Sequence, residues 1–418
     1  MTPEAGGNPP ASGPSIRVAH LTTVASSLRF LLLPQLRAVR DLPDGKGEAV
    51  GISAAGSDVE FLVKEGVTHI ALGSSTRSMN PLADVRSARE LWRILRRERF
   101  DVLHTHNPKP GLYGRVVGRL ARVPVVVNTN HGLYATENDG FLRRLVVLSL
   151  EAFAARFSHA ELIQNPEDVD LLLKRHVNVR KRTKLLGNGI DLQRFRPGAV
   201  PEGVRQSRRA ELTDRADAVV VGMVGRMVVE KGFRELFEAA RILRERFPDG
   251  RYVIAAVGPD DPEKADAITP EEIAAAREVG VVFLGHRLDV EALYAAMDLF
   301  VLPSYREGFP RAAMEAAATG LPIVASDVRG CRQVVDHDVT GLLVPVRDGA
   351  ALADAIAALG EDPTRREAMS KAAVVRAQEH FDERKVVDIV LSTYREVAAR
   401  KGRTDLVAAL DGREPASR

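Results

Sequence analysis

Short apolar runs alternate with amphipathic stretches along most of this chain, and the alternation is interrupted once. The first block begins with the apolar run at 16–21 and continues to about residue 187. A second block starts at residue 218 and continues to about residue 325. Strand, helix and strand in succession favour a parallel sheet with helices on both faces. The sequence therefore predicts an α/β protein with one doubly wound parallel sheet in each block.

Turn-forming residues mark the interruption. Asn188 and Gly189 form a turn-prone pair, and further Pro and Gly residues follow. We therefore expect a linker at 188–203, between a first domain over 16–190 and a second domain over 204–383. Ligands of such sheets bind beyond the carboxyl ends of the strands. Two domains of this kind predict a central cleft that holds the ligand.

The two ends of the chain differ from its body. Residues 1–15 are rich in Pro, Gly, Ala and Ser, and they lack the basic start and apolar stretch of a secretion signal. We expect a disordered tail there. The last helical stretch, at about 384–399, is expected to pack back onto the first domain, and residues 400–418 are expected to form a flexible tail.

Composition excludes several classes of protein. The 418 residues are 45% apolar and 28% charged, which is typical of a soluble globular protein of two or three domains. A net charge of +3 argues against a dedicated nucleic-acid binder. Cys331 is the single cysteine, which suits a reducing compartment, and no apolar run is long enough to span a bilayer. We therefore expect a cytoplasmic protein.

Basic residues are concentrated in the first half. Residues 1–195 carry 27 Lys and Arg against 19 Asp and Glu, and the rest of the chain has an excess of acids. The stretch 86–99 holds six arginines, and 140–150 is largely apolar with two arginines. This pattern suits peripheral contact with an anionic membrane, at the inner face of the cell membrane. The alternatives are solvated arginines placed by chance, and a core helix that carries surface arginines.

The first candidate binding residues follow an apolar strand in the second half. Gly225 permits a tight turn at the strand end, and Arg226 and Lys231 lie five residues apart on the same loop. The planar guanidinium can grip two oxygens while the ammonium neutralises remaining charge, so the pair suits a diphosphate. The alternative is a pair of solvated cations.

A second group of candidates joins the next strand to a helix. Glu307 lies in the loop and Glu315 in the early turns of the helix, which is expected to start near Pro310. The free N–H groups of a helix start attract anions. Carboxylates beside an anion site are costly unless they bind hydroxyl groups. The combination therefore predicts a ligand with both phosphates and diols, which is a nucleotide sugar.

These motifs together resemble glycosyltransferase family four. The resemblance rests on Val224-Gly225-Arg226 with Glu230-Lys231-Gly232, and on Glu307-Gly308-Phe309-Pro310-Arg311 followed by Glu315. It implies a retaining transferase with two Rossmann-like domains that face a central cleft, the GT-B fold. A His-Thr-x-x-Pro-Lys segment at 104–109 resembles a subgroup that builds polysaccharides on lipid carriers. Asn107, Lys109, Tyr113 and Arg115 are expected around the end of the strand that precedes this segment.

The resemblance also implies roles for single residues. Arg226 and Lys231 would hold the donor diphosphate, and Glu307 would bind hydroxyls of the donor sugar. Glu315 would bind the ribose. Backbone amides near Glu307 would assist it, and a later loop would contact the base. The assisting amides would be those of Gly308, Phe309 and Arg311. The loop that contacts the base would be Gly285–Asp289, which contains Arg287.

In the first half, His131 matches a position where many relatives carry a functional histidine near the sugar. A structural histidine is the alternative. His104 and His106 form a possible metal pair without an apparent third ligand, so we expect no metal and no cofactor. The partners implied are a nucleotide-sugar donor, with a UDP-sugar favoured, and a sugar or lipid-linked acceptor. A sugar-nucleotide epimerase of the same fold and a non-catalytic nucleotide-binding protein remain alternatives.

Overall fold

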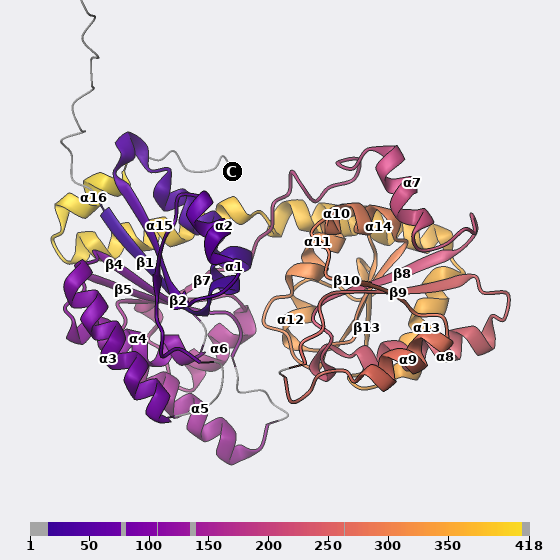
Figure 1. Cartoon of the computed structure of the whole chain (residues 1–418), viewed down its shortest axis with the longest axis horizontal. Coiled ribbons are helices and arrows are strands. Elements are labelled where there is room, and N and C mark those ends of the chain that lie inside the picture. Colours follow the sequence, from indigo (N-terminus) through magenta and orange to yellow (C-terminus); the bar gives the residue numbers. More distant parts are fainter. Residues whose placement is uncertain (1–15, 77–80, 107, 134–138, 263, 412–418) are drawn as a thin grey trace, which may run out of the picture. The chain divides into compact units, whose positions relative to one another are not determined.

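The computed structural model describes residues 16–76, 81–106, 108–133, 139–262 and 264–411. Contacts divide the chain into two compact units (Figure 1). Unit 1 contains the residues up to Leu186 together with those from Arg384 onward, and unit 2 contains Gly187–Glu383. The chain therefore leaves unit 1 once and returns to it at the end.

Unit 1 is built on a parallel sheet of seven strands within the described residues, in the order β3-β2-β1-β4-β5-β6-β7. The pairs of neighbouring strands are all parallel. The strands are β1 Ile16–Val24, β2 Gly47–Ala54, β3 Thr68–Ala71, β4 Val102–His106, β5 Val125–Asn130, β6 Ala160–Ile163 and β7 Thr183–Leu185.

Helices cover both faces of this sheet. One face packs against α1, α2, α15 and α16, and the other against α3 and α4 (Figure 1). A smaller apolar cluster lies under α5 and α6. The helices are α1 Ala25–Arg40, α2 Val59–Lys64, α3 Pro81–Glu98, α4 Pro108–Leu120, α5 Phe141–Ala154, α6 Pro166–Lys174, α15 Glu383–Arg400 and α16 Thr404–Leu410, with short 3-10 turns η1 Pro43–Gly45 and η2 Arg180–Arg182.

The end of the chain is more ordered than its sequence suggested. A flexible tail was expected from residue 400, but α16 places Leu406, Ala409 and Leu410 in the same core as β1 and α15. The spacing of these three residues gives even a seven-residue helix an apolar face. Residues 1–15 and 412–418, where tails were also expected, lie outside the described part of the chain.

Unit 2 repeats the plan with six parallel strands among the described residues, in the order β10-β9-β8-β11-β12-β13. Helices α10, α11 and α14 pack against one face, and α8, α9 and α13 against the other (Figure 1). The strands are β8 Val219–Val224, β9 Tyr252–Val257, β10 Val282–Gly285, β11 Leu299–Leu302, β12 Ile323–Ser326 and β13 Gly341–Val344. The helices are α7 Glu202–Ala210, η3 Val229–Lys231, α8 Phe233–Arg246, α9 Pro270–Glu278, α10 Val290–Ala296, α11 Arg311–Thr319, α12 Arg329–Arg332, α13 Gly349–Gly360 and α14 Pro363–His380.

The segment expected to be a linker contributes to unit 2. Ile190 and Phe195 are buried in its core. The amide of Ile190 donates to the carbonyl of Phe381 at 2.9 Å, so the start and the end of unit 2 lie side by side. Of the described helices, none is both long and apolar enough to cross a membrane.

Each sheet has a point at which its strand order reverses. In unit 2 the chain proceeds outward from β8 through β9 to β10, and then returns to β11 on the other side of β8. The loops after β8 and β11 therefore both lie at the carboxyl ends of adjacent strands, which is where doubly wound sheets bind their ligands. In unit 1 the corresponding pair is β1 and β4.

Candidate functional site

Two loops meet at the reversal point of unit 2. The loop after β8 carries Lys231 in the turn η3, and the loop after β11 runs towards α11. Gly232 follows η3 with φ +83°, and a Cβ at this position would lie 2.1 Å from the carbonyl oxygen of Pro303. A side chain would collide with that backbone, so glycine permits the close approach of the two loops.

Lys231 and Glu307 are brought together by this approach. The Lys231 Nζ donates to Glu307 Oε1 at 2.6 Å, although 76 residues separate them in sequence. The Ser304 hydroxyl donates to the same carboxylate oxygen at 2.8 Å. The Glu307 side chain is only 9% exposed and that of Lys231 is 26% exposed. A charged pair in this setting is held by strong hydrogen bonds and keeps one orientation. Sequence reasoning missed Ser304, which only the folded loop places beside Glu307.

Arg226 lies on the same loop but is more open. Its guanidinium is 47% exposed and binds Asp261 Oδ2 at 2.7 Å. The neighbouring Gly225 donates its amide to Val257 at the end of β9. A Cβ on Gly258 would lie 1.7 Å from the Gly225 carbonyl oxygen, so these two strand ends also touch through glycine. Arg226 thus follows an anchored backbone segment, and its charge is accessible to solvent and paired with Asp261.

Glu315 lies in α11, the helix that follows the loop of Glu307. Its side chain is 15% exposed, and its Oε2 accepts a hydrogen bond from Tyr294 OH at 3.3 Å. Burial raises the pKa of Glu315, and the nearby Arg311 opposes this shift. The helix begins at Arg311, with Pro310 directly before it, in agreement with the predicted start near Pro310. Pro310 has an extended backbone conformation, which is why it precedes the helix instead of opening it.

The backbone around Glu307 is packed tightly. A Cβ on Gly330 would lie 2.5 Å from the Glu307 carbonyl oxygen, so the start of α12 rests on this loop. Asn188 donates its side-chain amide to the Phe309 carbonyl at 3.0 Å. Gly308, Phe309 and Arg311 therefore lie on a segment that is fixed from two sides. Their assignment to donor binding stays a prediction.

Arg287 is engaged by two acids. Its guanidinium makes paired bonds of 2.8 and 2.7 Å to Asp289 and a further bond of 2.8 Å to Glu211, and these bonds raise its pKa. Any contact of this loop with a base would therefore come mainly from its backbone. A cavity of about 460 Å³ lies beside the loop, lined in part by Gly285, His286 and Gly258.

In unit 1, His131 follows β5 and ends a chain of imidazoles. His106 Nδ1 lies 3.0 Å from His131 Nε2, and His106 Nε2 lies 3.0 Å from His20 Nδ1. His104 bonds Tyr394 OH at 2.6 Å and Thr129 at 2.7 Å. Burial lowers the pKa of His131 to about 4 and that of His20 to about 3. These histidines are therefore neutral and hydrogen-bonded at pH 7.

His20 is the third histidine that the sequence did not reveal. One ring nitrogen each of His20, His104 and His106 lies within 4.8 Å of the others, so the three could hold a metal ion. Strand β1 lies beside β4 and pairs His20 with His104, a contact between distant parts of the sequence. The strand pairing of His20 with His104 and the hydrogen bond of His20 to His106 already explain their proximity. The expectation that no metal is required stays a prediction.

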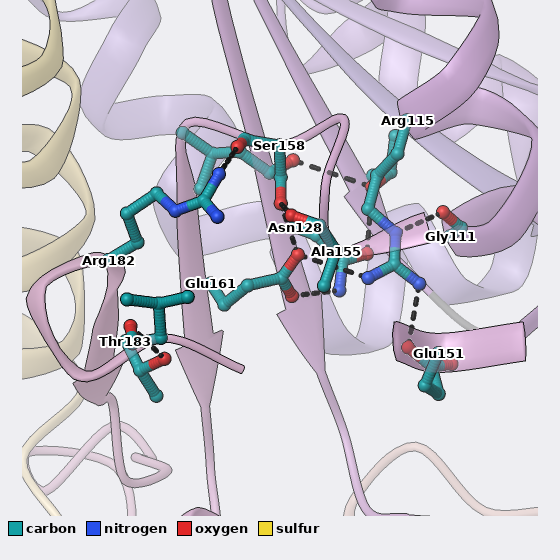
Figure 2. A network of polar contacts seen from close by, with 12 residues as sticks. Gly111, Arg115, Asn128, Glu151, Ala155, Ser158, Glu161, Arg182 and Thr183 are labelled. Carbon is teal, nitrogen blue, oxygen red and sulfur yellow. Dashed lines mark hydrogen bonds and ion pairs between the residues drawn. The ribbon is translucent and has the colours of Figure 1, made fainter. Parts of the chain in front are cut away.

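Arg115 has a structural role. It is buried, and its guanidinium binds Glu161 at 3.0 Å, Glu151 at 2.7 Å and the Gly111 carbonyl at 2.6 Å (Figure 2). Of the other residues expected around this strand end, Lys109 is paired with Asp84 at 2.6 Å. Asn107 lies outside the described residues.

Protein-family models match both halves of the chain. The model described as glycosyl transferases group 1 matches residues 218–362. The model described as a glycosyl transferase 4-like domain matches residues 36–189. The two matches together cover more than half of the sequence.

Named relatives agree with these models. The chain is 30% identical over 327 residues to the Escherichia coli UDP-Gal:alpha-D-GlcNAc-diphosphoundecaprenol alpha-1,3-galactosyltransferase, covering 78% of this chain and 83% of that protein. It is 26% identical to the Campylobacter jejuni N,N'-diacetylbacillosaminyl-diphospho-undecaprenol alpha-1,3-N-acetylgalactosaminyltransferase, covering 91% and 99%. The crystal structure of Anabaena HepE in complex with UDP and glucose has a TM-score of 0.72 at 20% identity, covering 90% of this chain and 99% of that one. That likeness establishes the fold.

Proposed function

This chain belongs to glycosyltransferase family four and is a glycosyltransferase of the GT-B fold, and we propose that it transfers a hexose or N-acetylhexosamine from a UDP-sugar, with retention of configuration. The acceptor would be a sugar or a lipid-linked sugar in polysaccharide or glycoconjugate synthesis. The observation that carries the proposal is the bonded pair of Lys231 and Glu307 at the reversal point of the unit 2 sheet.

The proposed reaction requires that the charge on its leaving group is stabilised. Breaking the bond between sugar and phosphate leaves negative charge on the departing diphosphate. Lys231, Arg226 and the first amides of α11 would stabilise that charge, and preorganised groups of this kind are a large term in catalysis. They would supply the positive charge without a metal ion, which is why we propose a metal-independent reaction.

The two acids would recognise hydroxyl groups on either side of the diphosphate. Glu307 is oriented by Lys231 and Ser304, so its second oxygen, Oε2, is available for a donor-sugar hydroxyl. Glu315 is held by Tyr294 and would accept from the ribose. The cavity beside Gly285 and Gly258 would take the base. His131, with one ring nitrogen bound to His106, is proposed to contact the sugar from unit 1.

The acceptor proposal is supported by the two bacterial relatives, whose names specify diphosphoundecaprenol-linked sugars. An acceptor of that kind lies in a membrane. Helix α5 of unit 1 exposes an apolar surface: Phe141 is 81% exposed and Leu142 is 71% exposed, and Leu145 and Val146 are about half exposed. Arg143 and Arg144 lie among them. This helix is not the buried core helix that was the alternative, and we propose that it contacts an anionic membrane surface.

The function is tested by thermal-shift screening with UDP-, GDP-, ADP- and TDP-sugars, followed by transfer assays with a lipid-diphosphate sugar acceptor. We expect the largest stabilisation from a UDP-sugar, and an α-linked product from an α-linked donor by NMR. Conversion of the donor to an epimer without acceptor would instead identify an epimerase. Binding of nucleotides without any turnover would identify a non-catalytic protein.

A further inference from the structure

A small basic pocket lies in unit 1, at the amino-terminal edge of its sheet. It has a volume of about 210 Å³ and lies beside the residues that enter β6 and β7. Five of its lining side chains are cations, and His159 lies among them. The cations are Arg119, Arg156, Arg182, Arg400 and Lys401. His131 lies at the opposite, carboxyl-terminal edge of the same sheet, so the pocket is separate from the candidate site.

The charge of this pocket is uncompensated. None of its lining residues is acidic. Within the described part of the chain, none of the five cations forms an ion pair, whereas other arginines of unit 1, such as Arg17, Arg29 and Arg115, do. Gathering like charges in a concave surface costs free energy, because each charge raises the potential felt by the others. An anion would remove that cost.

The hydrogen bonds around His159 have one donor too many. The backbone amide of Val126 donates to His159 Nδ1 at 2.9 Å, so the neutral ring must carry its proton on Nε2. Yet Arg119 Nη1 lies 2.6 Å and Lys401 Nζ 2.9 Å from this same Nε2. With Lys401 charged, three N–H groups therefore converge on one point with no acceptor between them, and burial and Arg119 lower the pKa of Lys401. Protonation of the ring does not relieve this crowding, because burial and the surrounding cations lower the pKa of His159 to about 3.

The backbone at the base of the pocket is fixed by the buried network of Figure 2. Ser158 donates its hydroxyl to the carboxylate of Glu161, which in turn accepts from Arg115. Arg182 donates to the Ser158 carbonyl at 3.1 Å, on the other side of the same residue. His159 therefore occupies a defined position when the cations gather around it.

We propose that this pocket binds a phosphate or diphosphate group, held by Arg119, Lys401 and the Nε2–H of His159. Phosphate oxygens accept several hydrogen bonds and carry the charge that the pocket lacks. The group can belong to a soluble phosphate compound or to the headgroup of a membrane lipid. The proposal does not depend on glycosyl transfer.

The test measures binding of inorganic pyrophosphate to the full chain by calorimetry. Lys231→Ala serves as background, so that binding at the candidate donor site does not contribute. In that background, Arg119→Gln with Lys401→Gln is expected to weaken binding about tenfold or more. The matched control is Lys174→Gln with Arg175→Gln, which removes two exposed unit 1 cations at the end of α6 and should leave binding within about twofold.

Two further readouts separate the sources of the phosphate. Pyrophosphate should shift the imidazole NMR signals of His159 in the otherwise native chain. Vesicles of equal parts phosphatidylcholine and phosphatidylglycerol are tested by sedimentation. Loss of vesicle binding in the pocket variant assigns the site to a lipid headgroup, and loss of pyrophosphate binding alone assigns it to a soluble compound. The proposal is overturned if the pocket variant binds both ligands as the control does, or if His159 does not respond.

Discussion

Lys231 Nζ lies 2.6 Å from Glu307 Oε1, so the proposed diphosphate cation also orients the proposed sugar-binding carboxylate. Ser304 bonds the same oxygen and leaves Oε2 for a hydroxyl group. Lys231 would therefore have two tasks. Substitution of Lys231 should affect both the departing charge and the position of the sugar.

Lys231→Ala should lower kcat with a UDP-sugar about a hundredfold or more, which is about 3 kcal/mol of transition-state stabilisation. The loss should appear in kcat more than in KM, because the diphosphate gains charge as its bond to the sugar breaks. Steady-state transfer assays measure it. Lys371→Ala is the control, since Lys371 is 75% exposed and pairs only with Glu367 on α14. Equal rates for the two variants would remove Lys231 from the mechanism.

Glu315→Gln should change how stability depends on pH. Because burial raises the pKa of Glu315 above its ordinary 4.5, the native state holds this proton more tightly than the unfolded state. Its contribution is therefore complete at low pH and is lost as the pH rises through the native pKa. Gln resembles the protonated acid, so the melting temperature of the variant minus that of the native chain should increase from pH 4 to pH 8.

Glu367→Gln is the control, because its melting-temperature difference should depend on pH in the opposite direction. A hydrogen bond from Lys371 lowers the pKa of Glu367, so its contribution is present at high pH and lost on acidification. The melting-temperature difference for this variant should therefore decrease, or stay flat, over the same range. If both differences follow the same trend, the burial of Glu315 does not control its titration.

Much of this architecture could be predicted because local patterns determine it. The alternation of strands and helices predicted two doubly wound parallel sheets, and this prediction is confirmed. The motifs around Lys231 and Glu307 were expected to bind one ligand, and the structure brings the two side chains together at one end of the same sheet. Their proximity follows from topology once β8 and β11 are neighbours.

The unpredicted features depend on contacts between distant parts of the sequence. His20 joins His104 only because β1 and β4 are adjacent, and Tyr394 reaches them from a helix near the end of the chain. Arg287 pairs with Glu211, 76 residues away, which the spacing of residues does not indicate. The basic pocket likewise combines Arg119 with Lys401. Neither spacing nor composition carries such information.

Helix α5 should control vesicle binding. Phe141→Ser with Leu142→Ser should weaken binding to vesicles that contain phosphatidylglycerol by about tenfold or more, because burying each apolar side chain contributes about 2 kcal/mol. Sedimentation with vesicles measures the change. Val339→Ser with Val375→Ser removes two apolar side chains that are 55% and 53% exposed in unit 2, and it should bind as the native chain does. Undiminished binding of the α5 variant would exclude this helix as the contact.

Two glycines with similar backbone conformations allow the close approach of the loops that carry Lys231 and Glu307 to be tested. Gly232 has φ +83° and Gly250 has φ +71°, so alanine introduces left-handed strain of about 1 kcal/mol at either position. Only at Gly232 would the new Cβ also meet backbone, 2.1 Å from the Pro303 oxygen, whereas Gly250 has nothing within 4 Å.

Gly232→Ala should therefore destabilise the protein clearly more than Gly250→Ala, in melting temperature and in denaturant titration. It should also lower the affinity for the UDP-sugar, since the loop of Lys231 must move away from the loop of Glu307. Gly250→Ala should bind the donor normally, because its turn precedes β9 at the amino-terminal edge of the sheet, whereas Lys231 follows β8 at the carboxyl-terminal edge. If both variants lose the same stability and both keep donor affinity, the contact between the two loops does not hold the lysine and the glutamate together.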